Sequence, residues 1–360
     1  MTELSKGKDK YLTSQHKLHW HLDRVADWTK GKSIVPLYID MGITQTCNIH
    51  CQYCYYATPE NRTTKIITTE NLIKFLNDAA EIGVKAIGFL GDGEPTVHPG
   101  CFDAVIAGAD AGLDMALSTN GAILKEDKLD RFLKSLTYIR FNISAANPEA
   151  YGVVMGTAPK MFYQVKKNIS KCIEIKKKLK LKTTIGMQMV LIEECVDQIV
   201  PFAQLGKELG VDYAQIKQCS EHGSISHGII PKDYTIYEEL FKEAETYSNK
   251  DYSVIIKRLK MSNKTRSYNS CFGCRFLPQI DGAGDVYPCG NWFGAKEFHM
   301  GNINTQSFKE IIFSKRYEEV QKKVTEEVNV HKQCGIGCRQ NEINEYLWNL
   351  KNPPQHINFI

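Results

Sequence analysis

The stretch Thr46-Cys47-Asn48-Ile49-His50-Cys51-Gln52-Tyr53-Cys54 decides most of what this chain can be. Its three cysteines have the spacing C-x3-C-x2-C. Three thiolates on one short loop can bind three irons of a cubane 4Fe–4S cluster, which leaves the fourth iron without a protein ligand. An open coordination position is where a metal does chemistry, as in catalytic zinc sites that lack one protein ligand. The stretch therefore predicts a catalytic iron–sulfur loop.

A zinc site and simply buried thiols are the alternatives for this loop. Zinc sites made of cysteines usually combine two C-x2-C pairs. A lone C-x3-C-x2-C group, early in a long chain of alternating strands and helices, fits that pattern poorly. We therefore favour iron at Cys47, Cys51 and Cys54.

The loop resembles the signature of the radical S-adenosylmethionine (radical SAM) superfamily. In that family the amine and carboxylate of SAM chelate the unique iron, and one electron from the cluster breaks the sulfonium C–S bond to give a 5′-deoxyadenosyl radical. Tyr53 matches an aromatic residue that lies against the adenine. The resemblance covers about residues 36–340 and is strongest at 47–54, 91–95 and 271–289. It implies SAM, a SAM-binding 4Fe–4S cluster and a reducing partner such as flavodoxin or ferredoxin.

The composition is that of an ordinary folded protein. The 360 residues are 42% hydrophobic and 24% charged, enough for one large and one smaller domain. The net charge of +4 gives no case for nucleic acid, which needs a clustered basic face. The densest basic stretch, residues 166–182, reads as the solvated face of an amphipathic helix.

No secretion signal or membrane segment is expected. Residues 1–32 are polar and charged, without an apolar core, and no stretch approaches the ~18 apolar residues of a membrane span. We therefore expect a cytoplasmic protein whose thiols stay reduced. Eight of the twelve cysteines fall within 47–54 and 271–338, and such grouping points to metal.

Strand-like and helix-like runs alternate between residues 36 and 220. Strands are expected at 37–41, 84–90, 115–118, 138–143, 183–191 and 213–217, and helices at 69–82, 101–111, 125–134, 161–179 and 195–209. This rhythm predicts an α/β fold with a parallel sheet and right-handed crossovers. The resemblance implies a partial (β/α)6 TIM-like barrel with a small C-terminal iron–sulfur extension of the SPASM/twitch type.

Site-like residues follow the expected strands, where active sites of parallel barrels lie. After the second strand comes Gly91-Asp92-Gly93-Glu94-Pro95, which resembles the family's GGEP motif, with Asp92 in place of a glycine. In the family this segment hydrogen-bonds the SAM amino group, here through Glu94 and the carbonyls of Gly91–Gly93. The bare motif could also be only a turn.

Four further polar residues lie near the ends of later strands. In relatives these positions contact the methionine and ribose of SAM, although each could equally be a strand-end cap or turn former. They are Ser118, Asn120, Ser144 and Gln188.

A second group of cysteines lies near the C-terminus, at Cys271, Cys274, Cys289, Cys334 and Cys338. The run Cys274-x9-Gly284-x4-Cys289 resembles the opening of the SPASM/twitch extension. A full SPASM domain has further cysteines for a second cluster, so one auxiliary 4Fe–4S cluster is expected. Two sets of four ligands are possible. One consists of Cys274, Cys289, Cys334 and Cys338, and the other of Cys271, Cys274, Cys289 and Cys338. A structural zinc site, C-x2-C with C-x3-C, is the alternative.

An auxiliary cluster suggests two reaction outcomes. The cluster can accept an electron from a substrate radical, which gives oxidation, or a thiol can return a hydrogen atom, which gives epimerisation. Cys219, just past the sixth strand, is the best placed thiol, although a free cysteine is often simply packed. Further candidates for substrate contacts are Lys217, Glu221, His222 and Arg275, each of which could also be ordinary surface.

The expected organisation has five parts. These are an N-terminal helical extension (1–35), the radical SAM core (36–225), a linker or helical connection (226–260), the auxiliary-cluster domain (261–340) and a closing helix with tail (341–360). Only 46 residues precede Cys47, fewer than in peptide-modifying relatives with a peptide-binding domain. We therefore expect a small, sugar-like substrate, with a peptide as the alternative. A non-catalytic iron–sulfur or zinc protein is the remote rival.

Overall fold

The computed structural model describes residues 11, 15–54, 56, 64–220, 231, 233–262, 265–335 and 337–359. In it the strands form one sheet in the order β10-β9-β8-β1-β2-β3-β4-β5-β6-β7. Neighbouring strands from β1 to β7 are parallel. The strand bounds are β1 Tyr38–Met41, β2 Ala86–Phe89, β3 Asp114–Thr119, β4 Leu136–Asn142, β5 Thr184–Leu191, β6 Tyr213–Gln218, β7 Ser253–Ile256, β8 Gln279–Ile280, β9 Asp285–Tyr287 and β10 Gly301–Asn302.

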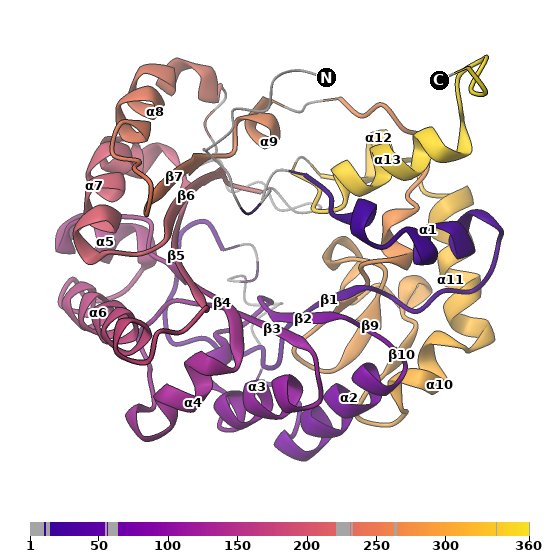
Figure 1. The fold of residues 1–360 in the computed structure, drawn as a ribbon, viewed down its shortest axis with the longest axis horizontal. Helices are drawn as coiled ribbons and strands as arrows, with labels where there is room; N and C mark the ends of the chain where they lie inside the picture. Colours follow the sequence, from indigo (N-terminus) through magenta and orange to yellow (C-terminus); the bar gives the residue numbers. More distant parts are fainter. Residues whose placement is uncertain are drawn as a thin grey trace.

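Helices cover the outside of this curved sheet, as Figure 1 shows for α2 to α8. Those along the barrel are α2 Thr69–Glu81, α3 Cys101–Asp110, α4 Leu129–Lys134, α5 Pro148–Met155, α6 Met161–Leu179, α7 Ile199–Leu209, α8 Glu238–Glu245 and α9 Arg258–Ser262. The ends of the chain add α1 Leu22–Thr29, α10 Phe308–Ile312, α11 Lys315–Glu326, α12 Val330–Gln333 and α13 Asn341–Lys351. None of the described helices is long and apolar enough to cross a bilayer.

The expected α/β partial barrel with a C-terminal extension is confirmed, and two further parallel strands join the six expected ones, β7 beside β6 and β8 beside β1. All six expected strands are present as β1–β6, and the expected helix at 161–179 coincides with α6. The segment 226–260, which we expected to be a linker or helical connection, contributes α8 and β7, and β7 pairs with β6 in parallel. Helix α5 was not predicted.

Alternation along the strands separates two environments. On β4, Ile139 and Phe141 are fully buried in the main hydrophobic core, so Tyr138, Arg140 and Asn142 face the inside of the barrel. The outward side chains pack under the helices, and the inward ones are largely polar. The inside of the barrel is therefore suited to polar ligands.

The C-terminal extension continues the barrel sheet. β8 pairs with β1 in parallel, and β9 then pairs antiparallel with β8 and β10. A second apolar core joins the N-terminal segment to this extension. In it Trp28 of α1 packs against Phe276, and Leu347 of α13 is fully buried. Figure 1 shows α1 on the same side of the molecule as α11 and α13.

Candidate active site

The three-cysteine loop follows β1 and is fastened to two other elements. The backbone N–H of Gln52 donates to the carbonyl of Val154 (3.0 Å), and that of His50 donates to Gly156 (3.3 Å), at the end of α5. The Asn120 amide, past the end of β3, donates to Asn48 Oδ1 (2.7 Å). The loop is therefore held over the C-terminal ends of the strands, as the sequence predicts.

The thiols of this loop form a donor set without other ligand types. Cys47, Cys51 and Cys54 are each half-buried. Burial raises the pKa of Cys51, and the neighbouring thiols of Cys54 and Cys47 raise it further. Over the described residues no three His, Cys, Asp or Glu side chains are grouped for a single metal ion. Three thiolates spread on one loop fit a cubane cluster, in which each thiolate binds its own iron.

Tyr53 lies where the ends of three strands meet. Its hydroxyl donates to Met155 Sδ (3.2 Å) and also interacts with Ser144 and Cys51. The Cys219 thiol lies 4.0 Å from the Tyr53 carbonyl. Ser144 in turn accepts a hydrogen bond from the N–H of Val190 (3.1 Å). Tyr53, Ser144 and Cys219 are thus brought together at the mouth of the barrel.

Glu94 ties the segment after β2 to the end of β3. Its buried carboxylate accepts hydrogen bonds from Thr96 N (3.1 Å) and Thr96 Oγ1 (2.6 Å), from Thr119 Oγ1 (2.5 Å) and from Asn120 N (2.7 Å). Burial raises the Glu94 pKa, and these hydrogen bonds act in the opposite direction. Pro95 follows as the first residue of a short 3-10 helix, Pro95–Val97. The carboxylate is therefore engaged within the protein and positions Asn120, which holds the cysteine loop.

The two glycines of the same segment allow close backbone packing. A Cβ on Gly91 would lie 2.4 Å from the Gly42 nitrogen, and one on Gly93 would lie 2.3 Å from the Thr44 carbonyl oxygen. Such contacts are forbidden to any side chain, so only glycine fits. The segment therefore packs directly against the chain that leads into the cysteine loop.

Asp92, which departs from the family's GGEP pattern, points to the C-terminal extension. Its Oδ2 accepts a hydrogen bond from the N–H of Gly282 (2.8 Å), between β8 and β9. Burial raises the Asp92 pKa to about 7, and the nearby Asp281 carboxylate adds to the effect. Asp92 therefore connects the expected SAM-binding segment to the extension.

A ladder of polar side chains crosses the inside of the barrel. Asn142 Nδ2 donates to Ser118 Oγ (3.1 Å), Gln188 Nε2 donates to Asn142 Oδ1 (3.0 Å), and Gln215 Nε2 donates to Gln188 Oε1 (2.8 Å). These side chains come from β3, β4, β5 and β6. Ser118 and Gln188 thus lie one layer deeper than Asn120 and Ser144, which are next to the cysteine loop.

The five C-terminal cysteines gather around Cys271. A hydrogen bond with the Cys274 thiol lowers the pKa of Cys271. Burial raises the pKa of Cys289 and of Cys338, and in both cases Cys271 is the neighbouring thiol with the largest effect. Burial also raises the pKa of Cys334, and the neighbouring thiols of Cys271 and Cys338 raise it further. The cluster therefore assembles residues from segments far apart in the sequence.

Amide side chains from α11 and the start of α13 support this group. Asn344 Oδ1 accepts from the N–H groups of Phe272 and Gly273 (both 2.7 Å), and its Nδ2 donates to Cys271 Sγ (3.4 Å). The Cys271 thiol donates to Gln340 Oε1 (3.2 Å), and the Cys274 thiol donates to Gln321 Oε1 (2.9 Å). Sequence reasoning missed these amides. The four-residue spacing of Gln340 and Asn344, just after Cys338, was the available signal.

The auxiliary cysteines lie near the mouth of the barrel. A Cβ on Gly337, between Cys334 and Cys338, would lie 2.6 Å from Gln218 Nε2 and 3.2 Å from Ser220 Oγ. Gln218 and Ser220 flank Cys219, so the second cysteine loop touches the end of β6. Arg275, a candidate for a substrate contact, instead pairs with Glu318 (2.7 Å). Glu221 and His222 lie outside the described residues.

Comparison with known families agrees with this geometry. The family model of the radical SAM superfamily matches residues 41–205, which run from β1 into α7. The model of the SPASM iron–sulfur cluster-binding domain matches residues 271–339. The chain belongs to the radical SAM superfamily. The two matched regions contain the three-cysteine loop and all five C-terminal cysteines.

Several radical SAM relatives resemble this enzyme over most of its length. The AdoMet-dependent heme synthase of Methanosarcina barkeri is 26% identical over 333 residues, which are 84% of this chain and 91% of that protein. The GTP 3′,8-cyclase of Helicobacter pylori strain HPAG1 is 26% identical over 70% of this chain and 79% of its own. The crystal structure of Streptococcus suis SuiB bound to S-adenosylmethionine has a TM-score of 0.65 at 18% identity, covering 89% of this chain and 77% of that chain.

Membership of this superfamily identifies the cofactors. A radical SAM domain binds a 4Fe–4S cluster and SAM, and a SPASM domain binds auxiliary iron–sulfur clusters. The cofactors of this radical SAM enzyme are therefore SAM, the SAM-binding 4Fe–4S cluster and an auxiliary 4Fe–4S cluster. Two separate groups of thiols, one of three and one of five, suit this assignment.

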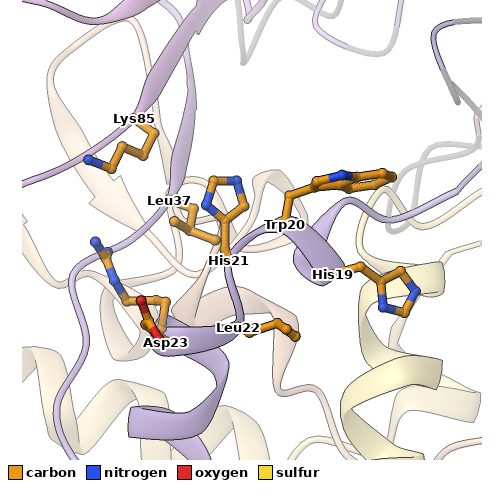
Figure 2. Close-up of a pocket in the computed structure, with 8 residues that line it drawn as sticks. His19, Trp20, His21, Leu22, Asp23, Leu37 and Lys85 are labelled. Carbon is orange, nitrogen blue, oxygen red and sulfur yellow. The ribbon is translucent and has the colours of Figure 1, made fainter.

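A separate pocket lies at the opposite end of the barrel. It has a volume of about 370 Å³. Figure 2 shows its lining, with Leu37 just before β1, Lys85 just before β2, and His19, Trp20 and His21 from the N-terminal segment. Because it lies at the N-terminal ends of β1 and β2, it is not part of the radical SAM site.

Proposed function

We propose that this enzyme cleaves SAM reductively and uses the 5′-deoxyadenosyl radical to remove a hydrogen atom from a small-molecule substrate, followed by oxidation or epimerisation. The observation that carries this proposal is that both cysteine loops approach the end of β6, the first through Tyr53 beside Cys219 and the second through Gly337 beside Gln218. This arrangement supports a substrate position inside the barrel near both groups of thiols.

In this proposal Cys47, Cys51 and Cys54 bind the SAM-binding cluster. That cluster supplies the electron that cleaves SAM, and a protein such as flavodoxin or ferredoxin supplies the electron to it. Asn120 fixes the loop through Asn48. The carbonyls of residues 91–93 accept hydrogen bonds from the SAM amine. Four side chains contact the methionine, ribose and adenine groups, namely Tyr53, Ser118, Ser144 and Gln188.

A small, polar, sugar-like molecule is the substrate we favour. The side chains that cross the inside of the barrel are hydroxyls and amides, which suit a ligand rich in polar groups. Two relatives that align with most of this chain are named for small molecules, heme and GTP. A peptide is the second candidate, because SuiB has also been solved with its precursor peptide SuiA. That structure shares 17% sequence identity with this chain and supports the fold more than the substrate.

We propose Cys271, Cys274, Cys289 and Cys338 as ligands of the auxiliary cluster, which supplies an electron acceptor near the substrate. The Cys274 thiol lies 3.6 Å from the Cys271 carbonyl oxygen, and this closeness favours a set that contains both residues. Single Cys→Ser variants at all five positions test this choice. Cys334→Ser is expected to keep the auxiliary cluster signal in electron paramagnetic resonance, and the other four variants are expected to lose it. Loss of the signal in Cys334→Ser would contradict the proposed set.

Cys219 is the proposed hydrogen-atom donor if the outcome is epimerisation. Its thiol is buried beside the Tyr53 carbonyl, at the level of the cysteine loop. In deuterated water Cys219→Ala should abolish deuterium incorporation into product while 5′-deoxyadenosine is still formed. Unchanged incorporation would eliminate Cys219 as the donor. No incorporation by the wild type, together with an oxidised product, would favour oxidation.

Iron and sulfide analysis after anaerobic reconstitution tests the whole proposal. The wild type should hold about eight irons, and a Cys47/Cys51/Cys54→Ala triple variant about four, as expected for two cubane clusters. With dithionite as reductant only the wild type should form 5′-deoxyadenosine from SAM. A triple variant with unchanged iron content, or a reconstituted wild type that cleaves no SAM, would refute the proposal.

A further inference from the structure

Two cationic side chains project into the barrel from different strands. On β6, Ala214 and Ile216 are fully buried in the outer core, so Lys217 belongs to the inward-facing series with Gln215. Arg140 belongs to the inward series of β4. Both residues are half-buried, so their side chains remain reachable from inside the barrel.

Neither cation forms an ion pair with a carboxylate among the described residues. Arg140 Nη2 donates to the neutral Ser118 Oγ (3.3 Å), and its buried Nε has no hydrogen-bond partner there. No described residue forms a hydrogen bond or ion pair with the Lys217 ammonium. Asp40, the buried carboxylate near Arg140, is paired with Arg339 (2.5 Å) and accepts from Gln279 (3.0 Å).

Other cations make the surroundings of Lys217 more positive. Burial lowers the Lys217 pKa to about 8, and the charges of Arg140, Lys260 and Arg339 lower it further, while the Cys219 thiol acts in the opposite direction. Lys260 has its own carboxylate, Glu342, at 3.8 Å. A buried charge without a partner is costly, and like charges nearby increase the cost. Such an arrangement persists when something outside the protein compensates for it.

We propose that Arg140 and Lys217 bind an anionic group of the substrate, a carboxylate or a phosphate, inside the barrel. Lys217 pairs with Val190, at the level of Ser144, and Arg140 pairs with Gly186, four residues further from the mouth of the barrel. The anion would therefore lie between these two levels. The rest of the substrate would then extend from this anchor toward the cysteine loop. This inference rests on the proposed function and narrows its substrate to an organic anion.

The guanidinium of Arg140 and the ammonium of Lys217 can bind one anion in complementary ways. Arginine presents a planar set of donors that matches carboxylate and phosphate oxygens, and lysine adds a compact point charge. The adjacent amides of Asn142 and Gln215 offer neutral donors for the remaining polar groups of the substrate.

The test measures how anions stabilise the reconstituted enzyme with SAM bound. Inorganic phosphate and succinate are each titrated, with sodium chloride at equal ionic strength to account for screening, and the unfolding temperature is recorded. The variants are Arg140→Met, Lys217→Met and the conservative Lys217→Arg. Lys178→Met, at an exposed position of α6, is the matched control.

We expect a saturable rise in unfolding temperature for the wild type, for Lys178→Met and for Lys217→Arg. In Arg140→Met and Lys217→Met the apparent affinity should fall at least about tenfold, the effect of losing ~1.4 kcal/mol of binding. A preference for phosphate or for succinate identifies the anion. Without added anion Lys217→Met should unfold at a higher temperature than the wild type, because an uncompensated charge is gone.

Equal stabilisation of all variants, or stabilisation by chloride alone, would overturn the anion site. A second result would also overturn the site. If Lys217→Met loses stability while both Met variants keep the anion affinity of the wild type, Lys217 has a structural role and does not bind the anion. SAM cleavage with dithionite is read separately. An enzyme that binds anions through these residues but cleaves no SAM would refute the proposed function and leave the anion site standing.

Discussion

Gly156 is the residue at which the cysteine loop meets α5 with no room for a side chain. It has a φ of +57°, and a Cβ there would lie 2.0 Å from the His50 carbonyl oxygen. Gly156→Ala should therefore lower the free energy of unfolding by about 1–3 kcal/mol and displace the loop. Urea unfolding and the iron content of the reconstituted variant measure the two effects.

Gly31→Ala is the matched control for this substitution. Gly31 has a φ of +78°, but nothing lies within 4 Å of a Cβ built on it. It should lose stability through backbone strain alone and keep the iron content of the wild type. Equal iron contents in both variants would show that the Gly156 contact does not shape the cysteine loop.

Asp92 gives the stability of the enzyme a specific pH dependence. Its pKa is raised to about 7, so the folded state holds this proton more tightly than the unfolded state. The associated stability is fully present below about pH 4 and is lost as the pH rises to about 7. In Asp92→Asn this loss should shrink, because asparagine cannot ionise and its Oδ1 can still accept from Gly282.

Urea unfolding of both proteins at pH 5 and pH 8 checks this prediction. Asp281, whose pKa burial raises to about 6, should leave a residual pH dependence in the variant. At pH 8 the variant should be the more stable protein. Identical pH dependence of the two proteins would rule out Asp92 as its source.

At the scale of elements, α13 organises the auxiliary cysteines through Asn344. Asn344→Leu leaves the N–H groups of Phe272 and Gly273 without their acceptor, at about 1–3 kcal/mol for each buried unpaired group. We expect lower stability and loss of the auxiliary cluster, with the SAM-binding cluster retained. Iron content should fall from about eight to about four. Asn349→Leu, at an exposed position of the same helix, should change neither quantity.

The elements predicted from sequence are those with long or strongly periodic apolar runs. Helix α6 has apolar residues at helical spacing over 19 residues, and its bounds were predicted as the structure has them. Strand β7 has only four residues, all buried, and its pairing with β6 depends on the finished barrel. Helix α5 is short and contains Gly152. The capping Asn147 followed by Pro148 was its one clear signal.

The residues of the candidate site also fall into those that the sequence can predict and those that it cannot. The cysteine loops and the segment 91–95 could be found because their chemistry lies in contiguous sequence. The role of Glu94 in holding Asn120, and the support of Cys271 by Asn344, could not be found, because these contacts join residues 26 and 73 positions apart. Arg140 and Lys217 lie on strands that are not neighbours, so their shared position inside the barrel depends on how the sheet curls.

At the scale of the whole molecule, Trp28 joins the N-terminal segment to the C-terminal extension. Its ring lies 5.3 Å from Phe272 and 6.0 Å from Phe276, and the Lys351 ammonium lies 4.9 Å from it. Trp28→Ala should lower the free energy of unfolding by about 3–5 kcal/mol, as for other buried aromatic residues. Trp20→Ala, at a side chain that is 65% exposed, is the control and should change stability little. Equal losses in the two variants would contradict a joining role for this core.

The pairing of β8 with β1 has a consequence for any attempt to divide the enzyme. The extension occupies one side of β1 in parallel register, at Asp40 and Met41. A chain cut before residue 271 would leave that side as an open row of N–H and C=O groups, which is a template for recruiting strands from other molecules. The auxiliary domain therefore also prevents self-association by covering this edge of the sheet. We expect an isolated barrel to aggregate and not to work as a minimal enzyme.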